Sequence, residues 1–299
     1  MRIKPQLRRE LPLYLMLALP LGLLLVFSYG PMFGLVMAFQ KFEPLMGFLG
    51  SKWVGLANFR RVFAFPDVWQ VVGNTLYIAV LKIVVETVAA ILAALLLNEV
   101  VSRRLKRTVQ TIIYFPYFLS WVILGGVLKD ILARDGIVNS LLGLFGIAPI
   151  LFLGNPDTFP WVLVLTETWQ ITGFGTIVFL AAITAISPTL YEAACIDGAG
   201  RLRQTWHITL PGMATTIVLM IVLSMGYILN AGFDQILMLY SPIVYRTGDV
   251  IDTWVYRMGL QQAQYALASA VGLMRSIVSF ILVALSYLVA YKAADYRIW

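Results

Sequence analysis

The sequence has little charge for its length. Of its 299 residues, 12% are Asp, Glu, Lys or Arg, whereas 60% are hydrophobic. A soluble domain carries about a quarter charged residues, and most of them lie on its surface. The shortage of charge therefore excludes an ordinary soluble domain and indicates a protein whose surface is largely in contact with lipid.

Cysteine and histidine are almost absent. Cys195 and His207 are the single residues of their types, so an internal disulfide and a multi-histidine metal site are excluded. We expect Cys195 to be a small buried side chain and His207 a polar one on a short helix. The sequence also has no G-x-x-x-x-G-K-S/T motif for binding ATP, and no carboxylate pair or nucleophile with a base near one membrane face. We therefore expect no enzymatic activity, and no cofactor or metal bound by this chain.

Long apolar stretches are abundant. A helix needs about 20 residues to cross the hydrocarbon core of a bilayer, and stretches of suitable length lie at 12–38, 70–97, 109–128, 159–186, 212–234 and 268–291. The first continues through Pro31 to Phe39 without a small-residue cleavage site, so we interpret it as a retained helix and not as a removed signal peptide. The sequence predicts an all-α integral membrane protein with six transmembrane helices.

The distribution of basic residues predicts the orientation. With six spans both chain ends lie on one side, together with two basic clusters. Loops rich in Lys and Arg stay in the cytoplasm, which predicts that both termini are cytoplasmic. Basic loops beside anionic lipid also explain the net charge of +7, so we expect membrane lipid and no nucleic acid as a partner. The clusters are Arg2, Lys4, Arg8 and Arg9, and Arg103, Arg104, Lys106 and Arg107.

The segment 187–211, between the fourth and fifth stretches, predicts two short cytoplasmic helices. Ser187 can cap the first helix, and Pro188 suits its first turn, where no N–H donor is needed. Gly198 or Gly200 can take the positive φ that ends it. A basic second helix follows from Arg201 to His207, and the chain then turns back toward the membrane. The predicted product is a compact, rigid element.

The residues of this segment match a known pattern. They resemble the EAA motif of the permease subunits of bacterial binding-protein-dependent ABC importers, with Trp206 where many members have Phe. The resemblance implies a permease domain over 70–299, with residues 1–69 forming a cytoplasmic segment, the first span and an outer loop. The matching positions are Glu192, Ala193, Ala194, Asp197, Gly198, Gln204, Ile208, Leu210 and Pro211.

Two further segments resemble one branch of that family. They are Tyr29 to Gly34 with Ala38-Phe39, and Asp249 to Arg257. Both are similar to the LplB-like permeases for oligosaccharides and polysaccharides, a branch that includes an alginate importer. The cargo implied is therefore an oligosaccharide or polysaccharide, with acidic ones such as alginate included.

The resemblance also implies partners and a mechanism. Two ATPase subunits bind ATP and Mg²⁺, a homologous but different second permease completes the passage, and an extracytoplasmic solute-binding protein delivers the cargo. The complex lies in the bacterial cytoplasmic membrane. The EAA segment forms a coupling helix that enters a cleft of the ATPase, where Glu192 makes polar contacts. The alternative for Glu192 is an ordinary solvated helix residue.

Polar residues inside apolar stretches are candidates for the cargo pathway, because they are unfavourable in lipid. Aromatic faces and neutral hydrogen-bonding groups suit sugars, although such groups also join helices to one another. An arginine in the passage would favour an acidic sugar, unless it pairs with Glu86, Glu167 or Asp234. In similar proteins such as the maltose permease, the helices on either side of the EAA segment line the sugar site, so the resemblance implies Trp169, Gln170, Phe174, Ser224, Tyr227 and Asn230 as pathway residues. Arg275 is added to them because it is an arginine within a span.

The remaining ionisable residues have structural interpretations. Lys82 and Glu86 are four residues apart and can pair on one helix face, whereas Glu167 and Asp234 lie near span ends and can reach the interface. A secondary transporter is a second hypothesis, but it often has an inverted repeat or broken helices, and neither is visible in the sequence. An importer of the same family for amino acids or peptides also remains open, because the EAA segment says little about cargo.

Overall fold

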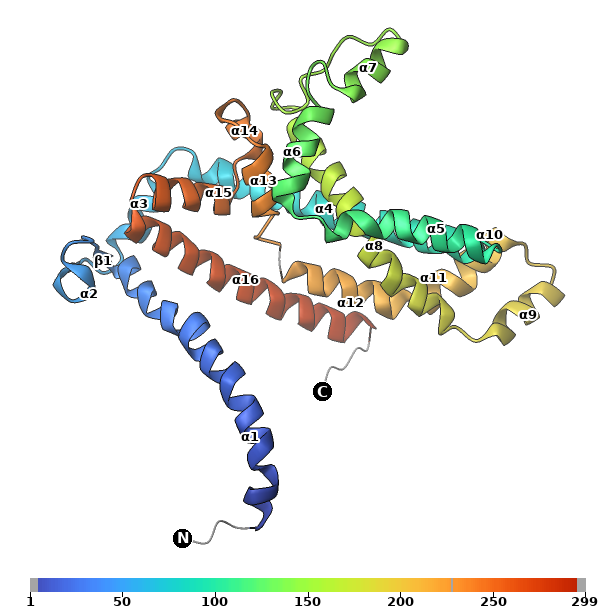
Figure 1. Ribbon diagram of the computed structural model, residues 1–299, viewed down its shortest axis with the longest axis horizontal. Helices are drawn as coiled ribbons and strands as arrows, with labels where there is room; N and C mark the ends of the chain where they lie inside the picture. Colours follow the sequence, from blue (N-terminus) through green and yellow to red (C-terminus); the bar gives the residue numbers. More distant parts are fainter. Residues whose placement is uncertain (1–4, 227, 295–299) are drawn as a thin grey trace. The chain divides into compact units, whose positions relative to one another are not determined.

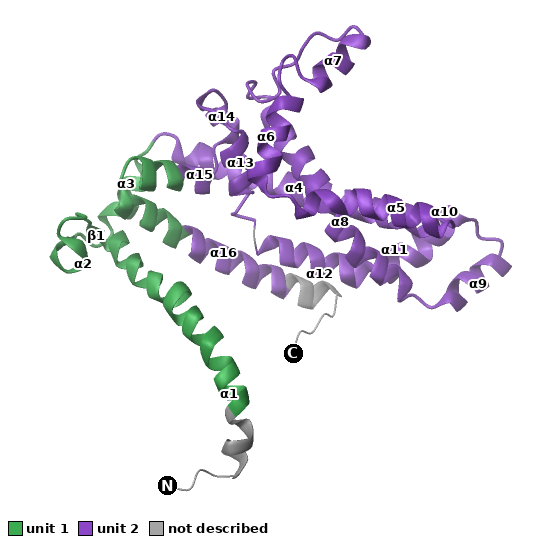
Figure 2. Ribbon diagram, viewed as in Figure 1, with its two compact units in different colours: residues 1–65, 255–274 green, residues 66–254, 275–299 purple. Residues whose placement is uncertain are grey.

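The computed structural model describes residues 5–226 and 228–294, and the side chains of 12–226 and 228–288. The described chain is mostly helical (Figure 1). It divides into two compact units, one of residues 1–65 and 255–274 and one of 66–254 and 275–299 (Figure 2).

The smaller unit begins with a long apolar helix and continues into short elements. The helix α1 passes into a π-helical turn at Leu25–Tyr29 and a 3-10 helix at Gly30–Phe39, so that Pro12–Phe39 forms one candidate membrane span. The 257–261 stretch is also π-helical. The named elements of this unit are α1 (Pro5–Leu24), β1 (Gln40–Lys41), α2 (Gly47–Gly50), β2 (Lys52–Trp53), α3 (Ala57–Phe63) and the start of α16 (Tyr265–Ala294).

A small hairpin closes the end of the first span. The strands β1 and β2 pair antiparallel, with Gln40 opposite Trp53. The buried Asn58 amide donates to the carbonyls of Ala38 and Gln40, at 2.9 and 2.8 Å. Phe39 stacks on Trp53 with 5.6 Å between the ring centroids. Aromatic packing and one buried amide therefore order this short sheet.

The larger unit contains the remaining helices. Two of them, α4 and α8, are long and continuous, and the others are shorter. The helices are α4 (Val68–Glu99), α5 (Arg103–Tyr114), α6 (Trp121–Ile131), α7 (Ile137–Leu144), α8 (Phe159–Thr184), α9 (Pro188–Ile196), α10 (Arg201–Gln204), α11 (Leu210–Gly212), α12 (Ala214–Met225), α13 (Phe233–Leu239), α14 (Tyr245–Gly248), α15 (Ile251–Tyr256) and the rest of α16.

The helices α4 and α8 pack along one another. Small residues permit the close approach, since a Cβ on Gly175 would lie 2.7 Å from the Cβ of Ala90. Toward the end of both helices a buried cluster joins Ala90 and Ala94 with Phe179 and Met213. Because lipid is as apolar as these side chains, close packing between small residues stabilises the pair more than burial does.

The candidate membrane spans agree in part with those predicted. In the described chain four helices are long and apolar enough to cross a membrane, and the number reaches six if each of two bent helix pairs counts as one span. The sequence predicts single helices at 109–128 and 212–234, and the structure instead bends both. The helices 103–118 and 121–131 meet at 106°, and the helices 201–212 and 214–225 meet at 57°.

Candidate functional site

The segment 187–211 forms two short helices, as predicted. Pro188 occupies the first turn of α9, but the Ser187 hydroxyl shares a hydrogen bond with Thr189 Oγ1 at 2.8 Å and does not cap a backbone N–H. Gly198 follows the helix with φ +76° and is the residue that ends it. Gly200 instead has φ −70° and begins α10, after which the chain stays helical through Thr205–Thr209 into α11.

Hydrogen bonds hold these two helices together. Gln204 is buried, and its amide donates to the Ala199 carbonyl at 2.9 Å and to Cys195 Sγ at 3.2 Å. The Tyr191 hydroxyl lies 3.0 Å from Thr209 Oγ1. These bonds fix α9 against the helical segment that follows it, so the element can move as one piece.

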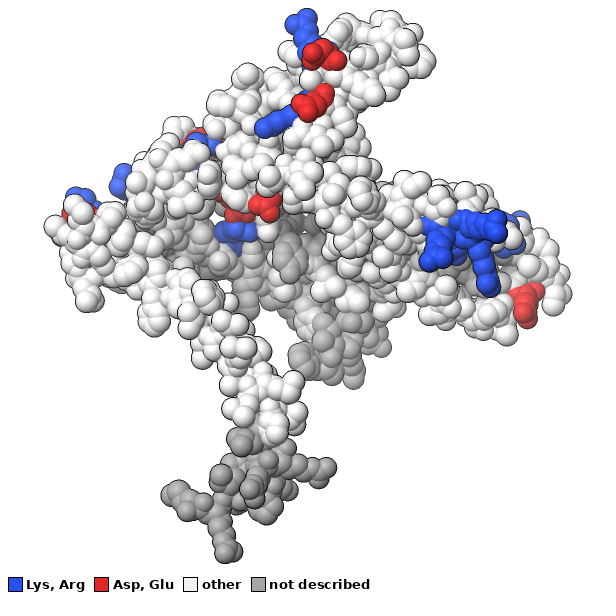
Figure 3. Space-filling model, viewed as in Figure 1, with Lys and Arg blue, Asp and Glu red and all other residues white. Residues whose placement is uncertain are grey.

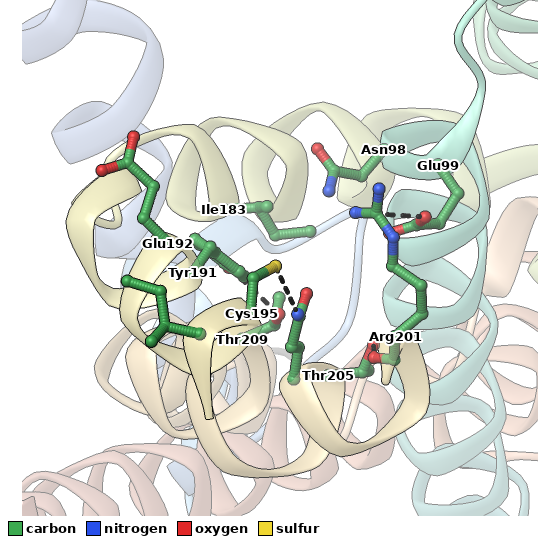
Figure 4. Close-up of a pocket in the computed structure, with 11 residues that line it drawn as sticks. Asn98, Glu99, Ile183, Tyr191, Glu192, Cys195, Arg201, Thr205 and Thr209 are labelled. Carbon is green, nitrogen blue, oxygen red and sulfur yellow. Dashed lines mark hydrogen bonds and ion pairs between the residues drawn. The ribbon is translucent and has the colours of Figure 1, made fainter. Parts of the chain in front are cut away.

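A cavity of about 500 Å³ separates α9 from the end of α4 (Figure 4). Arg201 reaches across to Glu99 with 3.8 Å between nitrogen and oxygen, and both side chains are more than half exposed. Cys195 lines this cavity and is exposed, so the prediction of a buried cysteine is wrong. The α9 helix has too few neighbours to cover that side chain.

The outer surface of the segment combines exposed charged and apolar side chains. Glu192, Ala193 and Asp197 are exposed, and the Glu192 carboxylate extends away from Cys195 and Thr209 (Figure 4). The most exposed apolar side chains are Ile196, Leu202 and Trp206, at 87%, 73% and 62%. Exposed apolar groups bordered by charges are typical of surfaces that bind another protein. The remaining predicted positions, Ala194, Ile208 and Leu210, are half-buried, and Pro211 is exposed.

The predicted pathway residues of α8 have protein partners at the first bend. The Gln170 amide donates to the Leu119 carbonyl at 2.9 Å, and Phe174 stacks on Tyr117 with 5.3 Å between ring centroids. Trp169 is half exposed. Gln170 therefore makes the helix-to-helix hydrogen bond that is the alternative to cargo binding.

The pathway residues at the end of α12 and in the turn after it differ in environment. The Ser224 hydroxyl donates to Met220 within its own helix, at 2.9 Å. Asn230 is exposed, in the turn between α12 and α13. Tyr227 lies outside the described residues.

Lys82 pairs with Glu167 of α8, and the predicted pairing of Lys82 with Glu86 on one helix face is wrong. The expectation that Glu167 reaches the membrane interface is also wrong, because its carboxylate lies against the buried Lys82. The reason is the close packing of α4 on α8, which brings the two side chains together. Gln235, which the sequence analysis does not select, is fully buried and binds the same lysine at 2.6 Å.

Arg275 pairs with Asp252 of α15, and none of its three predicted partners is correct. The arginine side chain is about one-third exposed, and the Asp252 carboxylate compensates its charge within this chain. Burial raises the pKa of the Asp252 carboxyl, against the opposing attraction of Arg275. The sequence signal for Asp252 was its place in the segment from Asp249 to Arg257.

Basic side chains gather over α5 (Figure 3). Arg103, Arg104 and Arg107 are exposed and Lys106 is half-buried, while the opposite face of the helix is apolar. The helix begins just after the end of α4, and Ser102 caps it by accepting from the Leu105 N–H at 3.4 Å. A basic amphipathic helix at a span end is suited to the charged surface of a membrane.

Comparison with known proteins identifies the family. The family described as "Binding-protein-dependent transport system inner membrane component" matches this chain over residues 86–295. The polygalacturonan/rhamnogalacturonan transport system permease protein YteP of Bacillus subtilis strain 168 is 42% identical over 96% of this chain and 90% of its own length. Protein LplB of the same organism is 40% identical over 93% of this chain and 87% of its own.

A solved structure agrees with these relatives. It is a bacterial ABC transporter involved in the import of the acidic polysaccharide alginate, and one of its chains matches with a TM-score of 0.88 and 37% identity, over 96% of this chain and 98% of that one. The predicted resemblance is confirmed. The chain is a multi-pass membrane protein that belongs to the family of inner membrane components of binding-protein-dependent transport systems, which are transport permeases.

Proposed function

We propose that this chain is the permease subunit of an ATP-driven importer that translocates an oligosaccharide or polysaccharide, acidic ones included. The observation that supports the proposal is the hydrogen-bonded two-helix element 187–211, on which Glu192, Ile196 and Trp206 are exposed and available to dock on an ATPase. The cargo class follows from the relatives, of which one is named for polygalacturonan and rhamnogalacturonan and another imports alginate.

The proposed arrangement has six membrane spans with both termini in the cytoplasm of a bacterial cell. The third and fifth spans then run through the bent helix pairs at the predicted 109–128 and 212–234, which leaves the basic start of α5 and the segment 187–211 outside the membrane. Residues 70–299 form the permease domain with 187–211 as its coupling segment. The basic helix α5 would lie on the same side, against anionic lipid. The opposite orientation of the chain would place these basic side chains on the extracytoplasmic side, contrary to the usual distribution of Lys and Arg.

The proposed partners are two ATPase subunits, a homologous but different second permease and an extracytoplasmic solute-binding protein. ATP and Mg²⁺ are held by the ATPases. A short helix with few internal degrees of freedom transmits a displacement without deforming, so closure of the ATPases would move α9 and α10 together and switch the passage between its two openings. Each switch is driven by the difference in ATPase affinity between the two conformations.

The first experiment purifies the tagged chain in mild detergent and identifies the co-purifying proteins by mass spectrometry. An ATPase and a second permease are expected. Reconstituted transport is then measured with neutral and acidic oligosaccharides of equal length, such as maltotriose and trigalacturonate, each with the solute-binding protein. Recovery of the folded chain alone would contradict the proposal.

The Glu192→Ala variant tests the coupling role. Because Glu192 is exposed, its removal should leave folding and membrane insertion unchanged. Transport should fall by about tenfold or more, as expected for loss of a charged contact at an interface, while ATP hydrolysis continues. Glu43→Ala removes a partly exposed carboxylate far from the segment in sequence and serves as the control. Wild-type transport by Glu192→Ala would exclude this role.

A further inference from the structure

The fifth apolar stretch is interrupted before it ends. The helix α12 stops at Met225 and α13 starts at Phe233, with Ala231 at φ 46° and Gly232 at φ 81° between them. A non-glycine residue with positive φ is strained, and such strain persists only where the surroundings hold it. Non-helical backbone at membrane depth also needs partners for its polar groups. The residues that hold this turn are therefore informative.

Lys82 of α4 holds the turn. Its ammonium group donates to the Ala231 carbonyl at 2.8 Å and to Gln235 Oε1 at 2.6 Å, and it pairs with Glu167 of α8. An ammonium has three N–H donors, so these partners use all of them. Lys82 is only 4% exposed. The contact with Gly232 is also close, since a Cβ there would lie 2.6 Å from Lys82 Nζ.

Gln235 continues the attachment to α8. Its amide nitrogen donates to the Leu163 carbonyl at 2.8 Å and to Thr166 Oγ1 at 2.7 Å. The side chain is fully buried, so these bonds are shielded from water. An ion pair that served only to join α4 to α8 would need neither Ala231 nor Gln235. The network instead fixes the turn and the first turn of α13 to two continuous helices.

The turn determines where Asn230 points. Leu229 and Ala231 are buried on either side of it, whereas Asn230 is exposed. In a continuous helix each residue is rotated by about 100° about the helix axis from the residue before it, so the side chain of residue 230 would point in a different direction. The left-handed residues 231 and 232 therefore set the direction of this amide.

We infer that Lys82 is a positioning residue for cargo passage: it holds the turn at 228–232 unwound, so that Asn230 faces the path of the cargo. This inference rests on the proposed function for the identity of the path. It differs from a cargo-binding role, because Lys82 is buried and acts through Asn230 and the backbone.

The test places a cysteine at Asn230. Cys195 is the chain's single cysteine, so Cys195→Ser gives a background in which Asn230→Cys alone reacts. The assembled transporter is treated with a charged, membrane-impermeant thiol reagent from each side of the membrane. Asn230→Cys should react from one side at least, and saturating cargo with its binding protein should slow the reaction. Absence of reaction from both sides would overturn the inference.

Three further variants in this background isolate the role of Lys82. The double variant Lys82→Met/Glu167→Gln removes both charges of the ion pair. Neither partner is then left as an uncompensated charge in the buried contact between α4 and α8. We expect the labelling rate of Asn230→Cys to change by about tenfold or more, since buried hydrogen bonds to a charged group have at least that effect on an equilibrium. Glu167→Gln alone keeps the contacts of Lys82 with the Ala231 carbonyl and with Gln235. Labelling there should stay near the starting rate, as it should in Lys129→Met, which changes an exposed lysine.

The outcomes separate positioning from a general structural role. An unchanged rate in the double variant, or an equal change in Glu167→Gln alone, would overturn the inference.

If the double variant does not accumulate in membranes, Gln235→Met replaces it, because it removes one partner of Lys82 and both bonds to α8. The same change in the labelling rate is expected. In a chain that keeps the native Asn230, the double variant should also raise the cargo concentration for half-maximal transport, while basal ATP hydrolysis stays unchanged. The labelling rates measured without cargo do not depend on transport, so failure of the wild-type chain to import a sugar would contradict only the proposed function.

Discussion

Two glycines in the coupling segment lie two residues apart but have opposite backbone requirements. Gly198 has φ +76° and Gly200 has φ −70°, and an added Cβ would meet no atom within 4 Å at either position. Space therefore does not distinguish them. Only Gly198 occupies the left-handed region that is unfavourable for residues with a side chain.

The matched variants Gly198→Ser and Gly200→Ser test this difference. Serine at 198 should lower the free energy of unfolding by about 1 kcal/mol through backbone strain, and should weaken the coupling of ATP hydrolysis to transport. Serine at 200 is a favourable residue at the start of α10 and should change stability by less than about 0.5 kcal/mol. Thermal unfolding of the detergent-solubilised complex and the ratio of transport to hydrolysis provide the measurements. Equal effects of both substitutions would show that φ does not govern this loop.

The partners of single charged residues were the least predictable part of the site. The sequence predicts that Lys82 and Arg275 need partners, because a charge in a span is unfavourable without one. It favours near neighbours such as Glu86, whereas the structure pairs Lys82 with Glu167 and Arg275 with Asp252. Those pairs depend on which helices pack together. The end of the first coupling helix, by contrast, could be predicted to within two glycines, Gly198 or Gly200, because the requirement for positive φ is local to the loop, and the structure selects Gly198.

At the scale of elements, two interruptions of the apolar stretches receive a hydrogen bond from a side chain of a continuous helix. Gln170 of α8 donates to Leu119 at the bend between α5 and α6, and Lys82 of α4 donates to Ala231 in the turn between α12 and α13. A carbonyl freed from a helix in an apolar environment needs such a donor. The long helices α4 and α8 thus serve as the frame on which the bent ones are held.

The Gln170→Leu and Ser224→Ala variants separate this structural role from cargo binding. Gln170→Leu removes the donor to Leu119 and should lower the free energy of unfolding by about 1–3 kcal/mol. Among the described residues Ser224 bonds within its own helix, to Met220, so Ser224→Ala should leave stability nearly unchanged, and any effect on transport would report a contact with cargo. Thermal unfolding and uptake by proteoliposomes are measured for both. Full stability of Gln170→Leu would contradict the structural role.

The span boundaries could be predicted better than the path of the chain within them. The predicted 70–97 and 159–186 correspond to α4, Val68–Glu99, and α8, Phe159–Thr184. Hydropathy reports the length of apolar chain, and continuous helices follow it closely. The bend after Pro116 and the turn at Gly232 lie inside apolar stretches, where hydropathy is uniform and the side chains that hold them come from elsewhere in the sequence.

At the scale of the whole molecule, the proposed orientation places α5 and the coupling segment on the cytoplasmic side and α7 on the other. The chain offers a direct probe of this arrangement, because Cys195 is exposed and is the one cysteine in the sequence. The matching probe for the other side is Asp135, an exposed residue before α7. Asp135→Cys in a Cys195→Ser background gives a chain whose single cysteine is at position 135.

An impermeant maleimide should label Cys195 in inside-out vesicles and leave it unlabelled in right-side-out ones, while Asp135→Cys in the Cys195→Ser background should show the reverse. The charge distribution is the reason, since a basic helix such as α5 is retained in the cytoplasm. Labelling of both residues from one side would exclude the proposed orientation. In inside-out vesicles that retain the ATPase subunits, labelling of Cys195 should slow, because the cysteine lies on the same helix as Glu192. Removal of the ATPases should restore the rate, whereas a rate that never depends on them would place their docking surface elsewhere on the chain.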